Sequence, residues 1–229
     1  MNKHQKKALV LFAKDPAPGK VKTRLSGLLD EDTILKLYIH FLAAGFKMLA
    51  SVKGADPVIA VAPPIASDFF QANPSAKSFE IFSQEGADLG QRMRQAILKC
   101  FDNGYERTVI IGADSPNLPV EYIQRALDSE EPLTLGPSVD GGYYLIGMGP
   151  KLIDVFDNVQ WGTETALAET GANARKKGYG VELLPVWYDI DRPEDLRYLK
   201  THMELSGGND ETAKSLLEFL ETLELKQTQ

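Results

Sequence analysis

The feature that most constrains this chain is a regular alternation of short apolar runs, rich in β-branched residues, with longer amphipathic runs. The short runs predict strands at residues 8–13, 57–61, 79–82, 108–112, 134–136 and 181–185. The longer runs predict helices at residues 30–53, 65–71, 89–103, 120–128, 163–177, 193–203 and 210–223. Such alternation favours a mostly parallel sheet covered by helices on both faces, which is a three-layer α/β/α sandwich.

The length of the chain, 229 residues, suits one domain with a sizeable core, and no repeat or long linker divides it. We expect residues 1–205 to form the body of the domain and residues 206–229 to form a helical extension of it. A soft joint at 206–209 leads into the last helix, and a polar tail at 224–229 follows it. The apolar residues of this helix pack either on the sheet or on a second subunit, so a homodimer stays open.

Composition excludes several classes of protein. The net charge of −7 and the pI near 5.1 argue against nucleic acid as a partner, because a phosphate backbone needs a broad basic face. No apolar run approaches the roughly 18 to 20 residues of a membrane span, so we expect no membrane partner and a cytoplasmic location.

Cysteine and histidine give no sign of metal or nucleophile chemistry. Cys100 lies in a helical pattern among apolar residues, where a small buried side chain is expected rather than a reactive thiol. His4, His40 and His202 lie far apart without a cysteine partner, which disfavours zinc and catalytic-triad chemistry.

The loop that follows the first strand, residues 14–24, is strongly basic. It holds four cationic side chains against Asp15 alone, a net charge of +3 in an acidic protein, and these are Lys14, Lys20, Lys22 and Arg24. In α/β sheets, ligands bind at the carboxyl ends of the strands, so the loop predicts a site for the phosphates of one small anion. The alternative is a solvated basic turn.

The backbone of this loop indicates which kind of phosphate site it can form. Two prolines stiffen it, and Gly19 would let an anion approach the main chain. If residues 20–24 stay extended, Lys20, Lys22 and Arg24 fall on one side. A P-loop would need glycine at position 14 and Ser or Thr at position 21, and a dinucleotide fingerprint would need more than one glycine, so both motifs are excluded.

Aspartates in two separate segments are candidate metal ligands. Asp114 ends the strand at 108–112 and is our first candidate for a Mg²⁺ or Mn²⁺ ligand, with a turn or helix cap as the alternative. Asp189 and Asp191 lie two residues apart before Pro193, and either could be a second ligand, whereas Asp191 could equally cap the following helix.

Three further segments could complete a pocket. Residues 136–147 contain Asp140, Gly141, Gly142 and Tyr143, which could line an acceptor site or simply form a hairpin. Arg92 lies at a predicted helix start, where it could meet anionic oxygens or be merely exposed. Trp161 is a core or pocket-wall residue, or a platform on which a substrate stacks.

As a set, these motifs resemble the nucleotide-diphospho-sugar transferase superfamily with the GT-A fold, and within it a bacterial glycosyltransferase-like family. The resemblance runs from about residue 8 to residue 199. It rests on residues 12–14 with 18–25, 88–93, 112–116, 136–137 with 140–147, 161–163 and 189–196. Two departures from the typical sugar nucleotidyltransferase are the proline-rich opening loop and the proline at position 116, where a second metal-binding aspartate would stand.

The resemblance implies a metal-dependent transferase that uses Mg²⁺ or Mn²⁺, held by Asp114 with Asp191 as the second ligand. The implied catalytic residues are Lys20, Lys22, Arg24 and Asp114. The implied nucleotide contacts are Ala13, Lys14, Gly19, Lys20, Lys22, Arg24, Arg92 and Asp114. The implied acceptor contacts are Asp140, Gly141, Gly142, Tyr143 and Trp161.

The reaction that the resemblance favours is nucleotidyl transfer from a nucleoside triphosphate to a small phosphorylated or hydroxyl acceptor, with release of pyrophosphate. Residues 189–196 are similar to a segment of cytidylyl- and guanylyltransferases, which supports that choice. Glycosyl transfer from a nucleotide-sugar and a non-catalytic nucleotide-binding regulator are the alternatives.

Overall fold

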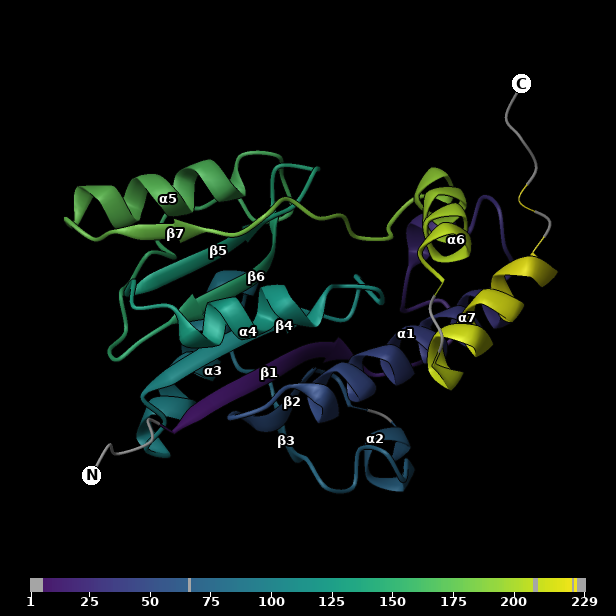
Figure 1. Cartoon of the computed structure of the whole chain (residues 1–229), viewed down its shortest axis with the longest axis horizontal. Helices are drawn as coiled ribbons and strands as arrows, with labels where there is room; N and C mark the ends of the chain where they lie inside the picture. Colours follow the sequence, from purple (N-terminus) through teal and green to yellow (C-terminus); the bar gives the residue numbers. More distant parts are fainter. Residues whose placement is uncertain (1–5, 66, 208–209, 224, 226–229) are drawn as a thin grey trace.

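The computed structural model describes residues 6–65, 67–207, 210–223 and 225, and these form a three-layer α/β/α sandwich (Figure 1). Its sheet has seven strands in the order β3-β2-β1-β4-β6-β5-β7. The strands are β1 (Lys7–Lys14), β2 (Asp56–Ala62), β3 (Glu80–Ser83), β4 (Arg107–Gly112), β5 (Leu133–Pro137), β6 (Tyr143–Met148) and β7 (Val181–Leu183). Four of the six strand pairings are parallel, which confirms the predicted fold class.

Helices cover both faces of this sheet. They are α1 (Glu31–Ser51), α2 (Phe69–Ala72), α3 (Leu89–Asp102), α4 (Val120–Asp128), α5 (Ala166–Lys176), α6 (Pro193–Ser206) and α7 (Glu211–Thr222). One core cluster joins α1, α4, α6 and α7 to one face, and a second joins α3 and α5 to the other. Alternate residues of β1 divide between the clusters, Leu9 and Leu11 facing α1 and Val10 facing α3, as the two-residue period of a strand requires.

Strand β6 is the element that the sequence pattern does not predict. It lies between β4 and β5 and runs antiparallel to both. The hairpin alternative for residues 136–147 is therefore correct, since β5 turns at residues 138–142 and returns as β6. All but the first residue of β6 are buried, and β4 and β5 are similarly buried, so β6 is an apolar run of the same kind as those that predict the other strands.

Helix α1 is the main core helix. The side chain of Asp30 accepts a hydrogen bond from the backbone N–H of Thr33, which caps the helix. By length and composition the helix could also cross a membrane, so the expectation that no apolar run approaches a span is wrong for this segment. Half of its apolar window is nevertheless buried inside the protein, as in the core helix of a globular fold.

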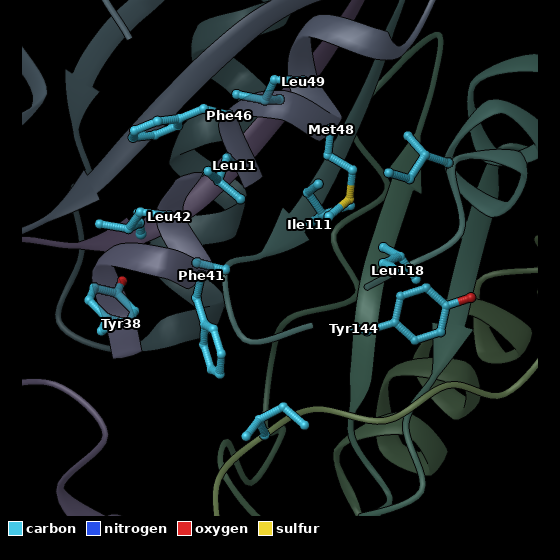
Figure 2. Packing of buried hydrophobic residues seen from close by; sticks show 14 of the residues in the cluster. Leu11, Tyr38, Phe41, Leu42, Phe46, Met48, Leu49, Ile111, Leu118 and Tyr144 are labelled. Atoms are coloured by element: carbon cyan, nitrogen blue, oxygen red, sulfur yellow. The ribbon is translucent and has the colours of Figure 1, made fainter. Parts of the chain in front are cut away.

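The contact between α1 and β1 is close because Gly45 has no side chain. A Cβ at this position would lie 2.9 Å from Cδ2 of Leu11. Figure 2 shows Leu11 among the α1 side chains Phe41, Leu42 and Phe46, and all four are almost fully buried. This packing holds α1 against the carboxyl-terminal half of β1, which leads into the basic loop.

Helix α7 packs against α1 and α6 of its own chain, through the buried residues Leu216 and Leu220. The apolar face of the last helix is thus covered by helices rather than by the sheet. His4, two residues of the predicted joint (208 and 209) and the predicted tail, apart from Leu225, lie outside the described residues. Cys100 is buried on α3, and burial raises the pKa of its thiol to about 11, which fits a packing role.

Candidate functional site

A cleft of about 580 Å³ opens at the edge of the sheet where the neighbouring parallel strands β1 and β4 both end. The basic loop, the start of α3, the β5–β6 hairpin and the segment before α6 supply its walls. Ligands bind at this position in open α/β sheets. The predicted site residues that line the cleft are Ala13, Lys14, Lys22, Arg24, Arg92, Asp114, Asp140, Gly142, Tyr143, Trp161 and Asp191.

The centre of the cleft is an ion cluster in which Lys22 lies between Asp114 and Asp191. The Nζ atom of Lys22 is 2.6 Å from Oδ1 of Asp114 and 2.9 Å from Oδ1 of Asp191. Arg24 donates from Nη1 to Oδ2 of Asp191 over 2.8 Å, so both oxygens of this carboxylate are paired with cations. The backbone N–H of Ile190 donates to the carbonyl oxygen of Asp114 over 2.9 Å and joins the two aspartate segments.

The backbone around Lys22 differs from the extended form considered for residues 20–24. Lys22 is in the left-handed region, with φ 45° and ψ 40°, and Thr23–Leu25 form a short 3₁₀ helix. Val21 and Leu25 are both buried, so the chain must turn to anchor both side chains in the core. As a result Lys22 and Arg24 reach the cleft, whereas Lys20 is exposed and does not line it.

The opposite charges of the cluster shift the pKa values of Lys22 and Asp191 so that both groups stay charged. Burial alone would lower the pKa of Lys22, but the charges of Asp114 and Asp191 outweigh it and the pKa is raised. Burial alone would raise the pKa of Asp191, but Lys22 and Arg24 outweigh it and the pKa is lowered. Lysine and carboxylate therefore hold each other in their charged forms near neutral pH.

Neither aspartate of the cluster caps a helix. The N-cap of α4 is Pro119, and that of α6 is Arg192. At α6 the carboxylate of Asp195 accepts from the backbone N–H groups of Asp191 and Arg192, at 2.9 and 2.7 Å. The helix-cap alternatives for Asp114 and Asp191 are thus wrong, and both side chains are left for the cleft.

Gly19 serves the turn of the loop rather than the cleft. Its φ of +67° is a conformation that glycine adopts without strain. A Cβ here would lie 3.1 Å from a carboxylate oxygen of Glu31, and the residue is not part of the cleft wall. The predicted role of Gly19, to admit an anion to the main chain, is not supported because the anion would meet the charge of Glu31.

Arg92 lies at a capped helix start and also lines the cleft. The side chain of Asp88 caps α3 by accepting from the N–H of Gln91 over 2.8 Å, which makes this segment an ordinary helix start. The Nε atom of Arg92 donates to the carbonyl oxygen of Gly86 over 3.1 Å, and the residue also lines the cleft.

One end of the cleft is acidic, because Asp140 and Asp189 both line it and lie close enough for the charge of Asp140 to act on Asp189. Asp140 accepts from the N–H of Gly142 over 2.9 Å, and Asp189 accepts from the hydroxyl of Ser138 over 2.9 Å. Asp189 therefore belongs to this end, whereas Asp191 belongs to the ion cluster, and the two-residue spacing points them to different partners. Burial, followed by the charge of Asp140, raises the pKa of Asp189 to about 6.

Trp161 forms part of the wall at this end. Its ring lies on the backbone of Gly90, where a Cβ would come within 2.4 Å of the ring, and it makes an edge-to-face contact with Tyr143. The wall interpretation therefore agrees with the geometry.

Gly141 faces away from the cleft. Its φ is +87°, and a Cβ would lie 2.1 Å from the carbonyl oxygen of Glu164. The N–H of Leu167 donates to the carbonyl oxygen of Gly141 over 3.1 Å. The residue thus fastens the hairpin turn to the start of α5, whereas Gly142 lines the cleft.

A substitution of Gly141 by alanine should lower the free energy of unfolding by roughly 3 kcal/mol, from left-handed strain and the clash with Glu164 combined. Gly162→Ala is the matched control, because Gly162 has a φ of +77° but no atom within 4 Å of its Cβ position. It should lose only about 1 kcal/mol. Urea unfolding measures both, and equal losses would refute the steric part of this account.

Some lining residues were not candidates from the sequence. Gln84 is buried beyond the end of β3, and its Nε2 donates to the carbonyl oxygen of Ala60 over 2.8 Å. Ser138, Thr23 and Thr163 also line the cleft. The one sequence signal for Gln84 is that a polar residue directly follows a short strand.

The predicted metal site has two converging carboxylates and no larger group of ligands among the described residues. Among the described residues, no group of three or more His, Cys, Asp or Glu side chains converges as a metal site. Asp114 and Asp191 do converge on one point, because both contact the same lysine nitrogen. Mg²⁺ typically takes only one or two protein carboxylates and completes its shell with water and phosphate oxygens, so this pair fits that ion in a nucleotide complex.

Comparisons with known proteins agree with this architecture. Residues 46–163 match the family described as "Uncharacterized protein conserved in bacteria (DUF2064)". A crystal structure from Desulfovibrio desulfuricans G20, provisionally assigned as a nucleotide-diphospho-sugar transferase, shares 35% sequence identity over 96% of each chain with a TM-score of 0.85. No curated protein matches the sequence significantly.

More distant structures share the fold. A cytidylyltransferase from Leptospira borgpetersenii has 14% identity over 98% of this chain and 99% of its own, with a TM-score of 0.58. The protein Rv0371c from Mycobacterium tuberculosis H37Rv, solved in complex with manganese, has 14% identity over 85% of this chain and 97% of its own, with a TM-score of 0.51. At these identities the likeness concerns the fold alone.

Proposed function

The chain belongs to the DUF2064 family and has the nucleotide-diphospho-sugar transferase fold, and on that basis we propose that it is a metal-dependent nucleotidyltransferase. The proposed donor is a nucleoside triphosphate, and the proposed acceptor is a small molecule that reacts through a hydroxyl group. The observation that carries this proposal is the convergence of Lys22, Arg24, Asp114 and Asp191 in one cleft at the ends of β1 and β4.

The cationic end of the cleft supports binding of the donor's phosphates. Lys14, Lys22 and Arg24 come from a single loop beside the cleft, and Arg92 lines it from α3. Charge-assisted hydrogen bonds from such groups are the strong ones in phosphate recognition. Asp114 and Asp191 would hold Mg²⁺ or Mn²⁺, which when bound neutralises charge on the phosphate oxygens.

The acidic end of the cleft supports a hydroxyl acceptor rather than a phosphorylated one. Asp140, Asp189 and Ser138 line it beside Trp161, and among the described lining residues the cations lie on the basic loop and α3 instead. Carboxylates accept hydrogen bonds from hydroxyl groups but repel a phosphate.

In the proposed reaction an acceptor oxygen attacks the α-phosphorus of the nucleotide in line. The new oxygen–phosphorus bond forms while the bond from the α-phosphorus to pyrophosphate breaks, and pyrophosphate leaves with that electron pair. The hydroxyl proton passes to the carboxylate of Asp140 or Asp189. Lys22 and Arg24 donate hydrogen bonds to the phosphates, so this chain contributes positioning and charge compensation.

The test of this proposal starts from thermal shifts with CTP, GTP, ATP, UTP, UDP-glucose and GDP-mannose, each with and without Mg²⁺ or Mn²⁺. A ligand that binds the native state raises its apparent stability. Product analysis follows with the nucleotide that binds. We expect pyrophosphate release; nucleoside diphosphate release would instead identify glycosyl transfer, and metal-dependent binding without turnover would identify a regulator. The absence of any shift would refute the proposal.

Acceptor preference is a separate prediction. Monosaccharides should be used with a kcat/KM at least about tenfold higher than that of the same sugars as monophosphates, because a phosphate would face Asp140 and Asp189. Coupled measurement of pyrophosphate release checks this ratio. In Asp140→Asn the ratio should fall, whereas a preference for the sugar phosphates in the unmodified protein would contradict the assignment of this end.

The remaining features follow from the same proposal. A nucleotide and a small acceptor are the partners that we propose, and neither nucleic acid nor a membrane is required. A cytoplasmic location belongs to the proposal because nucleoside triphosphates are supplied there. Whether the chain acts as a homodimer does not enter the chemistry.

A further inference from the structure

We propose that Lys22 occupies the site between Asp114 and Asp191 and excludes a divalent metal ion from it. The exclusion ends when the phosphates of the donor bind the ammonium group of Lys22. This inference rests on the proposed function for the identity of the phosphate ligand. It adds that metal and donor bind together, and that the protein without donor has little affinity for metal.

The first support is the occupancy of the carboxylates. The Nζ atom of Lys22 contacts one oxygen of Asp114 at 2.6 Å and one of Asp191 at 2.9 Å. The second oxygen of Asp191 accepts from Arg24 at 2.8 Å. A metal that approached Asp191 would thus meet a cation on either oxygen, and repulsion between two cations a few ångströms apart is strong in a partly buried site.

The second support is the way the lysine is held. Its side chain is only 3% exposed, and its ammonium lies 5.9 Å from the centre of the Phe41 ring, which is fully buried beneath it. The left-handed backbone of Lys22 is strained and persists only where the surroundings enforce it. Val21 and Leu25, buried on either side, provide that enforcement and direct the lysine into the cluster.

The third support is the contrast between the two cations of the cluster. The side chain of Arg24 is 61% exposed, so it can leave Asp191 for a ligand at little cost, whereas Lys22 is enclosed. The phosphates of a donor offer Lys22 an alternative anion at the open side of the cleft. Because binding free energies are reciprocal, a metal that needs the lysine displaced must bind more tightly when phosphate is present, and the phosphate more tightly when metal is present.

The test measures Mn²⁺ retained by the protein on ultrafiltration, with no catalytic assay. Lys22→Met keeps the length of the side chain and removes its charge. It should retain one Mn²⁺ per chain at least about tenfold more tightly than the unmodified protein, which lies in the usual range of coupling between sites. Lys20→Met is the matched control, because Lys20 is exposed on the same loop and does not line the cleft, and it should behave as the unmodified protein does.

Two additions make the outcome specific. In the double variant Lys22→Met/Asp114→Asn the gain in Mn²⁺ retention should disappear, which assigns the ion to this cluster, and circular dichroism confirms that each variant is folded. With inorganic tripolyphosphate as the probe, the unmodified protein should retain Mn²⁺ that it does not retain alone.

Equal Mn²⁺ retention by the unmodified protein and Lys22→Met would overturn the inference, and so would failure of tripolyphosphate to promote retention. Failure of the proposed function looks different. In that case no nucleoside triphosphate shifts the melting temperature or is turned over, while Lys22→Met still gains Mn²⁺.

Discussion

Asp114→Asn is expected to lower kcat/KM for nucleotidyl transfer about 10³-fold. A loss of this size is typical when one preorganised group that stabilises charge in the transition state is removed. Asparagine keeps the shape of the side chain but removes the charge that pairs with Lys22 at 2.6 Å. The loss should appear in kcat as well as KM, because this charge is needed where the phosphorus reacts and not only where the donor binds. Pyrophosphate release at saturating donor separates the two parameters.

Asp102→Asn is the control for this prediction. Asp102 is the last residue of α3 and is exposed outside the cleft, so its variant should keep full activity. Thermal unfolding must show that Asp114→Asn remains folded. A loss of less than tenfold in a folded Asp114→Asn protein would remove Asp114 from the reacting centre.

Phe41→Ala is expected to lower the free energy of unfolding by about 4 kcal/mol, within the range for deletion of a fully buried aromatic side chain. Phe41 has no exposed surface and lies on α1 where the helix packs on the sheet, as Figure 2 shows. Its ring also lies beneath the ammonium of Lys22, so the cavity would loosen the floor of the ion cluster. Urea unfolding with an unchanged m-value measures the loss.

Phe69→Ala provides the comparison, since Phe69 has the same side chain but is only partly buried, at the start of α2. It should lose less than half as much stability. Similar losses in both variants would show that burial against α1 and β1 is not the source of the effect.

Much of this architecture can be predicted from local pattern. Alternating runs identify six of the seven strands, because residues 8–13 are apolar and residues 108–112 are both apolar and rich in β-branched residues. The basic loop and Asp114 are predicted as neighbours because parallel strands end at the same edge of a sheet, and both do line one cleft. Strand β6 is missed because Asp140 and the glycines before it suit a ligand pocket as well as a hairpin turn.

For the site residues, too, local pattern predicts the type of residue but not its partners. Lys20 and Lys22 are equivalent by type and spacing, and only the left-handed turn at Lys22 sends one into the cluster and the other to the surface. Asp189 and Asp191 are likewise indistinguishable in the sequence, yet one accepts from Ser138 and the other from Lys22 and Arg24. Such choices depend on partners that are distant in the chain.

For this protein the sequence alone determined six of the seven strands, the edge of the sheet where the cleft forms and the chemical types gathered there. These are consequences of periodicity and of short polar segments after apolar strands, which act over a few residues. Only the tertiary structure decided that β6 lies between β4 and β5, that Gly141 faces Glu164 and that Lys22 pairs with two aspartates. The physical reason is that packing and charge pairing depend on distances in space, which no local spacing along the chain contains.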